Sequence, residues 1–556
     1  MGRFIIGVLI LAPNLALACG GLFCNAQTPV NQAAERILFA QTDDGLEMHV
    51  RITYQGPPTE FGWLLPVPQD VDYGLSTDQL FNQLDGSFGP RFNLRTEVDE
   101  RCRNFGRSSD DELFAAAGGA DASVQEGPEE SVAVLSREAV GPYDLAVLLP
   151  TSVGVLREWL DSNGYQIPEA ADATLSPYVE MGSAFIALKL LPSAGSGDVQ
   201  PLKMNFGGDI PAVPIVPTSV AANPDMGIIV QLLADARAVT TNYRHVTINE
   251  AAIDWGNQGS NYADVVSQAV DEAGGQAFVT DFAGPHDDRV FLPTVSDETL
   301  ERLRTLDGDI ADGAELWTQI EDTLLGELRQ NDADFSRIAQ GVISVPESMD
   351  VTELLRSPWR FVGTPEAQLI EVDVEALIER IDVEINDTRE GIAALFQRNP
   401  YLTRLYSTMS PEEMTLDPVF GWNRDLPQQS NVRNAVRRVR CTFDGRPDWD
   451  NAIIETESGI RFAERDNENP NIIRRQAGET VRGFDLPAAA TIEMQMPAGQ
   501  TQLVQDNRPE IAESLSRGSA GGCACDVNGS DTPVSWLFAL LFGGSLLRVK
   551  RRREQH

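Results

Sequence analysis

The chain has 556 residues, of which 83 are aspartate or glutamate and 43 are lysine or arginine, so its formal net charge is −40. Such a charge repels nucleic-acid phosphates, and we therefore exclude nucleic acid as a partner. The length allows two to four domains, and a hydrophobic content of 42% is sufficient for a buried core.

The N-terminus has the features of a secretory signal peptide. Arg3 precedes an apolar run, Phe4 to Leu11, and Ala16-Leu17-Ala18 is a small-residue cleavage site. We predict a signal peptide over residues 1–18, cut by signal peptidase between Ala18 and Cys19. A cysteine directly after the cut also allows lipoprotein processing, but Ala16 stands where lipoprotein signals usually have leucine.

Export would permit disulfides, because they persist in oxidising compartments. The six cysteines are Cys19, Cys24, Cys102, Cys441, Cys523 and Cys525. The last two belong to the tail, and Cys19 and Cys24 bracket a short glycine-containing loop. That leaves Cys102 and Cys441 to pair with each other. Closing so long a loop removes unfolded-state entropy worth on the order of 4–5 kcal/mol in the chain-entropy model.

The first elements read as strands. Ile37 to Ala40 is apolar, residues 47–54 alternate, and Asp43-Asp44-Gly45 between them predicts a hairpin. The alternation puts His49 on the polar face, and we interpret it as a surface histidine. Residues 61–68 form an apolar strand in which Trp63 is expected in the core.

Further along, strands and helices alternate. Gly106 to Glu130 is rich in small and acidic residues and predicts a surface loop. Phe185 to Leu191 has the length and composition of a strand. Helical spacing covers Val153 to Asn163 and Tyr262 to Ala273. We predict a mixed α+β domain over residues 19–290.

Several long motifs resemble the bacterial family called domain of unknown function 2330. They are Cys19 to Cys24, Gln32 to Phe39, Phe61 to Pro68, Val140 to Asp144, Trp159 to Tyr165, Phe185 to Leu190, Tyr401 to Tyr406 and Asp417 to Phe420. The resemblance covers roughly residues 19–425. Because that family has no agreed activity, it implies no catalytic residue and no cofactor.

The pattern changes after residue 290. Helical spacing covers Glu298 to Leu306, Leu316 to Leu328 and Val374 to Phe396, the last with a break expected at Asn386-Asp387. We predict a helical region over 291–425 and a small β-rich region over 426–510, where Ser458-Gly459 marks a hairpin. The fold class is thus α+β, with a β-rich mixed N-terminal domain, a helical middle region, a small β-rich C-terminal region and a single C-terminal hydrophobic helix.

The search for catalytic motifs is negative. GxSxG, HExxH, the Walker A loop and a GxGxxG in a strand-to-helix context are all missing. His286-Asp287-Asp288 reads as a turn after Gly284-Pro285, and the acidic run beginning at Asp307 departs from the EF-hand register because Asp312 stands where glycine is required. We predict no catalytic, cofactor-binding or metal residues.

The tail specifies a location. A flexible tether over 511–522 leads to Cys523 and Cys525, an apolar run over 534–547, and a basic cluster that ends in Arg551, Arg552 and Arg553. The basic end should remain cytoplasmic. The run has about 14 residues, fewer than the roughly 20 that a permanent span requires.

This tail resembles the MYXO-CTERM sorting signal over residues 523–556. The resemblance implies cleavage by a myxosortase-like membrane protease and anchoring through the cysteine motif at Cys523 and Cys525. An ordinary C-terminal transmembrane anchor is the alternative. We therefore expect an exported, surface-anchored envelope protein with a non-catalytic structural or binding role and an unknown ligand. The alternative is a surface hydrolase with a carboxylate-based site.

Overall fold

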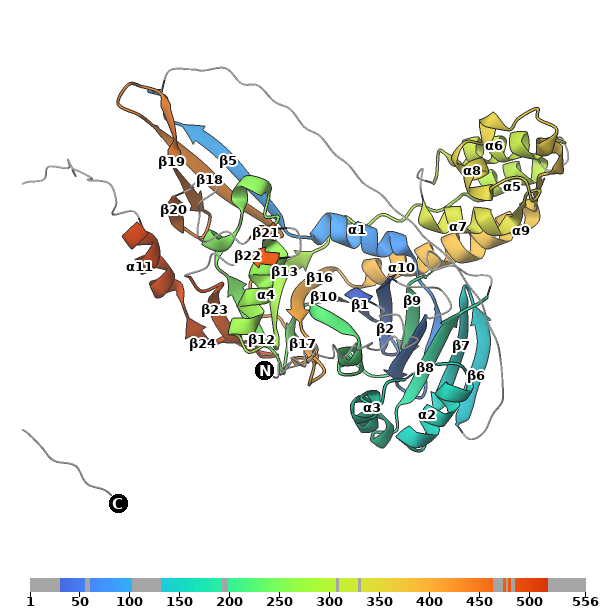
Figure 1. Ribbon diagram of the computed structural model, residues 1–556, viewed down its shortest axis with the longest axis horizontal. Helices are drawn as coiled ribbons and strands as arrows, with labels where there is room; N and C mark the ends of the chain where they lie inside the picture. The colour runs from blue at the N-terminus through green and yellow to red at the C-terminus, as the bar shows by residue number, and fades with distance from the viewer. Residues whose placement is uncertain are drawn as a thin grey trace, which may run out of the picture.

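The computed structural model describes residues 31–55, 61–102, 132–165, 167–192, 199–306, 310–328, 332–463, 474–476, 479–481 and 486–518. Its centre is a mixed sheet of ten strands (Figure 1). In spatial order the strands are β24 (Gln502–Asp506), β23 (Ala489–Met494), β12 (Arg244–Ile248), β13 (Ala277–Pro285), β16 (Tyr401–Met409), β10 (Ala222–Ala234), β1 (Asn31–Gln41), β2 (Leu46–Gln55), β9 (Leu202–Phe206) and β4 (Asp72–Leu75). The sheet therefore joins strands from distant parts of the chain.

The predicted hairpin between β1 and β2 is confirmed. Gly45 has φ +153°, and its carbonyl accepts from the Thr42 N–H at 2.9 Å. Antiparallel pairing then places Ile37 opposite Val50. On its other side β1 runs parallel to β10, with Phe39 beside Leu232. Because β1 is hydrogen-bonded on both sides and covered on both faces, its apolar run is fully buried.

A second sheet packs on one face of the first. It contains β3 (Gly62–Val67), β8 (Ala184–Leu190), β7 (Tyr143–Leu149) and β6 (Ala133–Val140). The two sheets share a core that includes Trp63, as predicted. The outer face of the second sheet is covered by α2 (Val153–Ser162) and α3 (Ala171–Glu180). Ser152 begins α2 by accepting from the Val155 N–H at 3.3 Å.

Helices cover the other face of the central sheet. α1 (Asp78–Phe88) and α10 (Thr388–Arg398) bury their apolar sides on β1, β10 and β16. α4 (Tyr262–Glu272) packs further along against β12, β13 and β23. This α4 corresponds to the helix predicted to begin at Tyr262.

The helical region forms a lobe of its own beside the sheets, here called the helical lobe, residues 297–380 (Figure 1). It contains α5 (Asp297–Leu306), α6 (Gly313–Leu324), α7 (Ala333–Val342), α8 (Val351–Arg356), α9 (Val374–Arg380) and the short pair β14 (Ile343–Ser344) and β15 (Glu371–Val372). The break expected at Asn386-Asp387 appears as a π-helical stretch, Ile381–Asp387, which links α9 to α10 without interrupting the helix. Asn386 bonds the Val295 backbone there through both its oxygen and its nitrogen.

A four-stranded sheet projects from the opposite side of the molecule, and we call it the arm (Figure 1). Its strands are β20 (Arg461–Ala463), β19 (Pro447–Thr456), β18 (Val432–Cys441) and β5 (Arg91–Val98). β19 and β20 are the hairpin predicted around Ser458-Gly459, and Gly459 has φ +84° there. β5 comes from the N-terminal region and pairs in parallel with β18, so segments far apart in sequence form one sheet.

The remaining elements are small. They are the pair β11 (Arg237–Thr240) and β17 (Phe420–Asn423), the pair β21 (Arg474–Gln476) and β22 (Glu479–Val481), and α11 (Arg508–Gly518). Residues 511–518 of the predicted flexible tether are therefore helical. Mixed sheets with helices confirm an α+β architecture. How the chain divides into domains stays a prediction, as does the apolar helix over 534–547, which lies outside the described residues. Among the described helices, none has both the length and the apolar composition to cross a bilayer.

Candidate functional site

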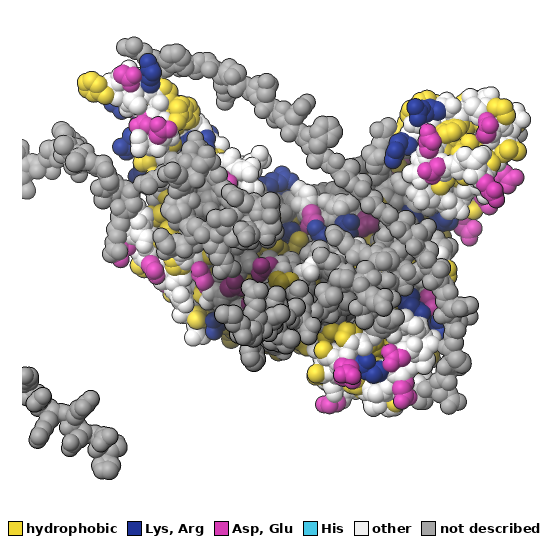
Figure 2. Space-filling view, viewed as in Figure 1, with side chains coloured by type: hydrophobic (Ala, Val, Ile, Leu, Met, Phe, Trp, Pro, Cys, Tyr) yellow, Lys and Arg dark blue, Asp and Glu magenta, His cyan; other side chains and the backbone are white. Residues whose placement is uncertain are grey.

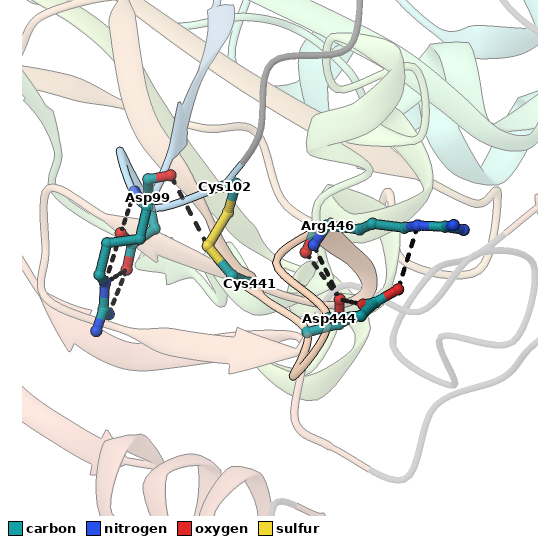
Figure 3. Close-up of a disulfide and its surroundings, with 7 residues drawn as sticks. Asp99, Cys102, Cys441, Asp444 and Arg446 are labelled. Atoms are coloured by element: carbon teal, nitrogen blue, oxygen red, sulfur yellow. Dashed lines mark hydrogen bonds and ion pairs between the residues drawn. A yellow bond between two sulfur atoms is a disulfide. The ribbon is translucent and has the colours of Figure 1, made fainter.

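The cysteine pair predicted from the sequence is confirmed. Cys102 and Cys441 form a disulfide with their Cα atoms 5.3 Å apart (Figure 3). It joins the segment after β5 to the end of β18, so it ties together the two chain segments of the arm. The other predicted residues, Ala18, Cys19, Cys24, Cys523, Cys525, Arg551, Arg552 and Arg553, lie outside the described residues.

The two acidic motifs of the sequence have local roles. The His286 ring is buried, and its Nε2 donates to the Phe396 carbonyl at 2.9 Å. Asp287 and Asp288 follow with φ of 51° and 52°, as in a tight turn. Asp312 accepts from the Glu315 N–H at 2.9 Å and so begins α6. In the part of the chain that the structure describes, no three His, Cys, Asp or Glu residues are placed to hold a metal ion.

His49 is not a surface residue, and this prediction was wrong. Its side chain has no exposed surface. The alternation along β2 correctly assigns it to the face opposite the sandwich core. That face is covered, however, because the segment from β4 into α1 runs over it and carries Ser76. A period-two pattern identifies the face of a strand but not what packs on it.

His49 stands between a carboxylate and a hydroxyl. Its Nε2 is 2.8 Å from Glu47 Oε1, and its Nδ1 is 2.7 Å from Ser76 Oγ. Against the effect of burial, the hydrogen bond from His49 lowers the pKa of Glu47, so Glu47 is ionised and can only accept. In the neutral ring Nε2 therefore carries the proton and Nδ1 accepts from the Ser76 hydroxyl. This is the order of groups that activates a serine nucleophile.

The next residue along the chain extends this network into the helical lobe. Thr77 caps α1 and donates to Asp334 Oδ2 at 2.5 Å. Asp334 also accepts from Arg389 at 2.7 Å, and Arg389 bonds both oxygens of Asp332 at 2.8 Å. Arg389 and Asp332 are fully buried. An ion pair of this kind holds α7 against α10 and the start of α1, because removing either partner leaves an unpaired buried charge.

A second network, buried at Arg404 and Asp281 and partly exposed at Arg36 and Asp85, lies under the middle of α1. Arg404 on β16 pairs with Asp281 on β13 and lies 3.3 Å from Asp85 on α1. Asp85 also accepts from Arg36 on β1 at 2.8 Å. The Tyr262 hydroxyl of α4 donates to the other oxygen of Asp281. Two helices and three strands therefore meet through a single network of charged and polar groups.

The Glu47–His49–Ser76 group is closed to solvent. Ser76 is 4% exposed and His49 is 0% exposed. The group can therefore act on a substrate only if the cover formed by the β4–α1 segment and α7 moves. Sequence inspection missed it because the serine lies in no known motif and comes 27 residues after the histidine. The available signal was Ser76-Thr77-Asp78, which is typical of the start of a helix.

Two surface cavities are each lined by several carboxyl groups. One, of about 400 Å³, lies at the β1–β2 turn and is lined by Gln41, Thr42, Asp43, Asp44, Gly45, Gly208 and Asp209. The other, of about 770 Å³, lies between α5 and α9 and is lined by Asp297, Leu300, Glu301, Arg304, Asp373, Glu375, Ala376, Ile378, Glu379 and Asp382. Neither contains the Glu47–His49–Ser76 group.

Glu35 on β1 is a buried carboxyl group with a raised pKa. It is 4% exposed, its neighbours on the adjacent strands are Ile52 and Ile228, and burial raises its pKa to about 7. Its Oε2 has no hydrogen-bond partner among the described residues. Glu35 lies on the sandwich side of β1, since Ile37 two residues on belongs to that core. It is therefore a buried acid in an apolar layer rather than one half of a carboxylate pair in a cleft.

Comparison with known proteins places the chain in a family. Residues 13–304 match the model of a family described as uncharacterized protein conserved in bacteria (DUF2330). The matched stretch is more than half of the 556 residues. The motifs at Tyr401 to Tyr406 and Asp417 to Phe420 lie beyond it. No curated protein matches the chain, and no solved structure matches it.

We predict that Arg389→Ala strongly destabilises the helical lobe. The change leaves Asp332 and Asp334 buried without their cation, which costs about 3–5 kcal/mol. The matched control is Arg398→Ala on the same helix, whose exposed pair with Asp43 should contribute less than about 1 kcal/mol. Denaturant unfolding measures both variants. Equal stability of the two would contradict a structural role for the buried pair.

We predict that Glu35 makes the protein less stable as the pH rises. Its pKa is raised from 4.5 to about 7, so the stability that it contributes is complete below pH 4.5 and is lost as the pH rises through 7. Glu35→Gln should match the parent near pH 4 and exceed it at pH 8 by roughly 1–3 kcal/mol. Unfolding at both pH values tests this, with the exposed Glu366→Gln as the control. If Glu35→Gln stabilised the protein as much at pH 4 as at pH 8, the raised pKa of Glu35 would not be the cause.

Proposed function

Because this chain belongs to the DUF2330 family of uncharacterized proteins conserved in bacteria, we propose that it is an exported envelope protein with a structural or binding role. It enters the membrane system through the signal peptide over residues 1–18. It is held at the cell surface by its tail. The ectodomain then acts by presenting surfaces to other envelope components.

One observation carries this proposal, the disulfide between Cys102 and Cys441. Disulfides that hold a fold together are rare in the bacterial cytosol, where thiols are kept reduced, and are common after export. The bond links segments 339 residues apart, so it constrains a large part of the chain. It therefore supports an oxidising location independently of the N-terminal and C-terminal sequence signals.

The arrangement of the buried charges favours a non-catalytic role. The buried networks join α1, α10 and the helical lobe to the sheet. Charges paired in this way stabilise one arrangement of the parts. A rigid multi-lobed body is suited to display and contact.

The tail supplies the anchor in this proposal. Cys523 and Cys525 form the processing and attachment point, the apolar run over 534–547 holds the precursor in the membrane, and the basic cluster stops transfer. A myxosortase-like membrane protease would then remove the C-terminal segment. A run shorter than a full span is consistent with a segment that is removed rather than kept.

The first test of export is the mature N-terminus. We predict that it is Cys19, after cleavage at Ala18, and that mass spectrometry under non-reducing conditions shows Cys102 joined to Cys441. Ala16→Arg with Ala18→Arg should block cleavage, because the site requires small residues. A mature chain that begins at Met1 with both thiols reduced would refute export.

The second test concerns the tail. We predict that Cys523→Ser with Cys525→Ser leaves the ectodomain folded but changes the mature mass or the surface retention. The matched control is Ser519→Ala in the preceding tether, which should be processed as the parent is. A double variant that matures and stays at the surface like the parent would reduce the tail to a plain membrane anchor.

One observation favours a hydrolase as a second candidate, namely the Glu47–His49–Ser76 order of hydrogen bonds. If the cover over Ser76 opens, its Oγ can attack an electrophile while His49 Nδ1 takes the proton. A fluorophosphonate then forms a bond from Ser76 Oγ to phosphorus and releases fluoride. This candidate predicts labelling of the parent, loss of labelling in Ser76→Ala, and retained labelling in Ser87→Ala. An unlabelled parent would eliminate it.

A further inference from the structure

The arm ends in apolar side chains that face solvent. Phe443, at the turn between β18 and β19, is fully exposed, Trp449 is 54% exposed and Val98 is 40% exposed. Figure 2 shows hydrophobic side chains gathered at this outer end. The base of the arm is different, because Phe92, Ala435, Ile454 and Phe462 are buried against the core around α4. Burial therefore anchors the arm and leaves its outer end free.

The outer end is held in shape. The disulfide ties Cys102 to Cys441 directly beside the turn (Figure 3). The Thr442 N–H donates to the Arg446 carbonyl at 2.8 Å, and the Gly445 N–H donates to the Thr442 carbonyl at 2.9 Å. Because the turn is ordered before any contact, little conformational entropy remains to be lost on binding. A preorganised aromatic tip of this kind is typical of a contact surface.

Charge limits what the tip can contact. Arg446 pairs with Asp444, and Arg101 pairs with Asp99. Asp448 and Asp450 lie beside Trp449, so the tip carries no excess of positive charge. It cannot be attracted to an anionic surface, and the net charge of −40 opposes such a surface further. Adjacent cations and carboxylates instead match a headgroup that carries both signs.

We propose that the tip of the arm inserts Phe443 and Trp449 into the interface of a zwitterionic phospholipid layer, of the phosphatidylethanolamine type. The arginines face the lipid phosphates, and the aspartates face the ammonium groups. Aromatic rings are favoured at this depth of a bilayer, and arginine side chains can extend to the headgroups. The proposal rests on the envelope location proposed above, and it adds a second membrane contact distinct from the tail.

The test uses the full chain in vesicles of phosphatidylethanolamine and phosphatidylcholine that contain a photo-crosslinking phosphatidylethanolamine. Crosslinked residues are located by mass spectrometry. We expect crosslinks in the tail over 534–547 and, separately, at residues 441–450. Phe443→Ser with Trp449→Ser should reduce the crosslinks at 441–450 by at least about tenfold and leave those in the tail unchanged. The matched control is Trp359→Ser, another exposed aromatic residue, which lies on the helical lobe.

The outcomes separate the two proposals. Tail crosslinks without any at 441–450 would overturn the tip contact and leave the anchor intact. Tip crosslinks without tail crosslinks would support the tip and count against the anchor. Crosslinks at 441–450 that persist in the double variant, or that fall equally in Trp359→Ser, would overturn the proposal. So would a tip that crosslinks to a second protein molecule instead of lipid. Vesicles of phosphatidylglycerol should give fewer tip crosslinks, because charge opposes the approach.

Discussion

The rest of the structure depends on the pairing of charges that α1 buries against the central sheet. Arg36 on β1 and Arg404 on β16 lie under the helix, and both bond Asp85. The helix covers these strands with apolar residues as well, so the Arg404 side chain is only 6% exposed, whereas Arg36 at the edge of the helix is 26% exposed. Arg404 therefore requires carboxylates at the same depth. α1 supplies one of these carboxylates, Asp85, and its position also places Ser76 and Thr77 at its start. Thr77 then donates a hydrogen bond to Asp334, which is paired with Arg389.

Arginine is suited to this arrangement and lysine is not. Of the 43 basic residues in the chain, only Lys189, Lys203 and Lys550 are lysine. A guanidinium group presents several donors in one plane and can hold two carboxylates at once, as Arg389 holds Asp332 and Asp334. The two interior networks balance each cation against nearby carboxylates, so they contribute little to the net charge of −40.

Local patterns in the sequence predicted local structure well. The hairpin of β1 and β2, helices α2 and α4, the β19–β20 hairpin and the buried Trp63 all follow from periodicity and turn residues. The Cys102–Cys441 pair followed from counting cysteines, without geometry. The pairing of β5 with β18 and of β1 with β10 could not be predicted, because no short-range signal encodes which distant strands meet. His49 was misplaced for the same reason: the strand pattern carries no information on the segment that covers it.

The distribution of charge explains how one chain can present different surfaces. The helical part, residues 297–398, contains nine arginines and twenty-four aspartates and glutamates. The arm, residues 91–102 and 432–463, contains nine arginines and eight aspartates and glutamates. The helical part is therefore strongly acidic and the arm is close to neutral. Since like charge opposes the approach of a second copy or of an anionic layer, contact through the helical lobe costs more than contact through the arm. The arm also carries the exposed Phe443 at its outer end. A protein of this composition that has to touch an apolar surface can do so at lowest electrostatic cost through a neutral projection that stands away from its acidic body.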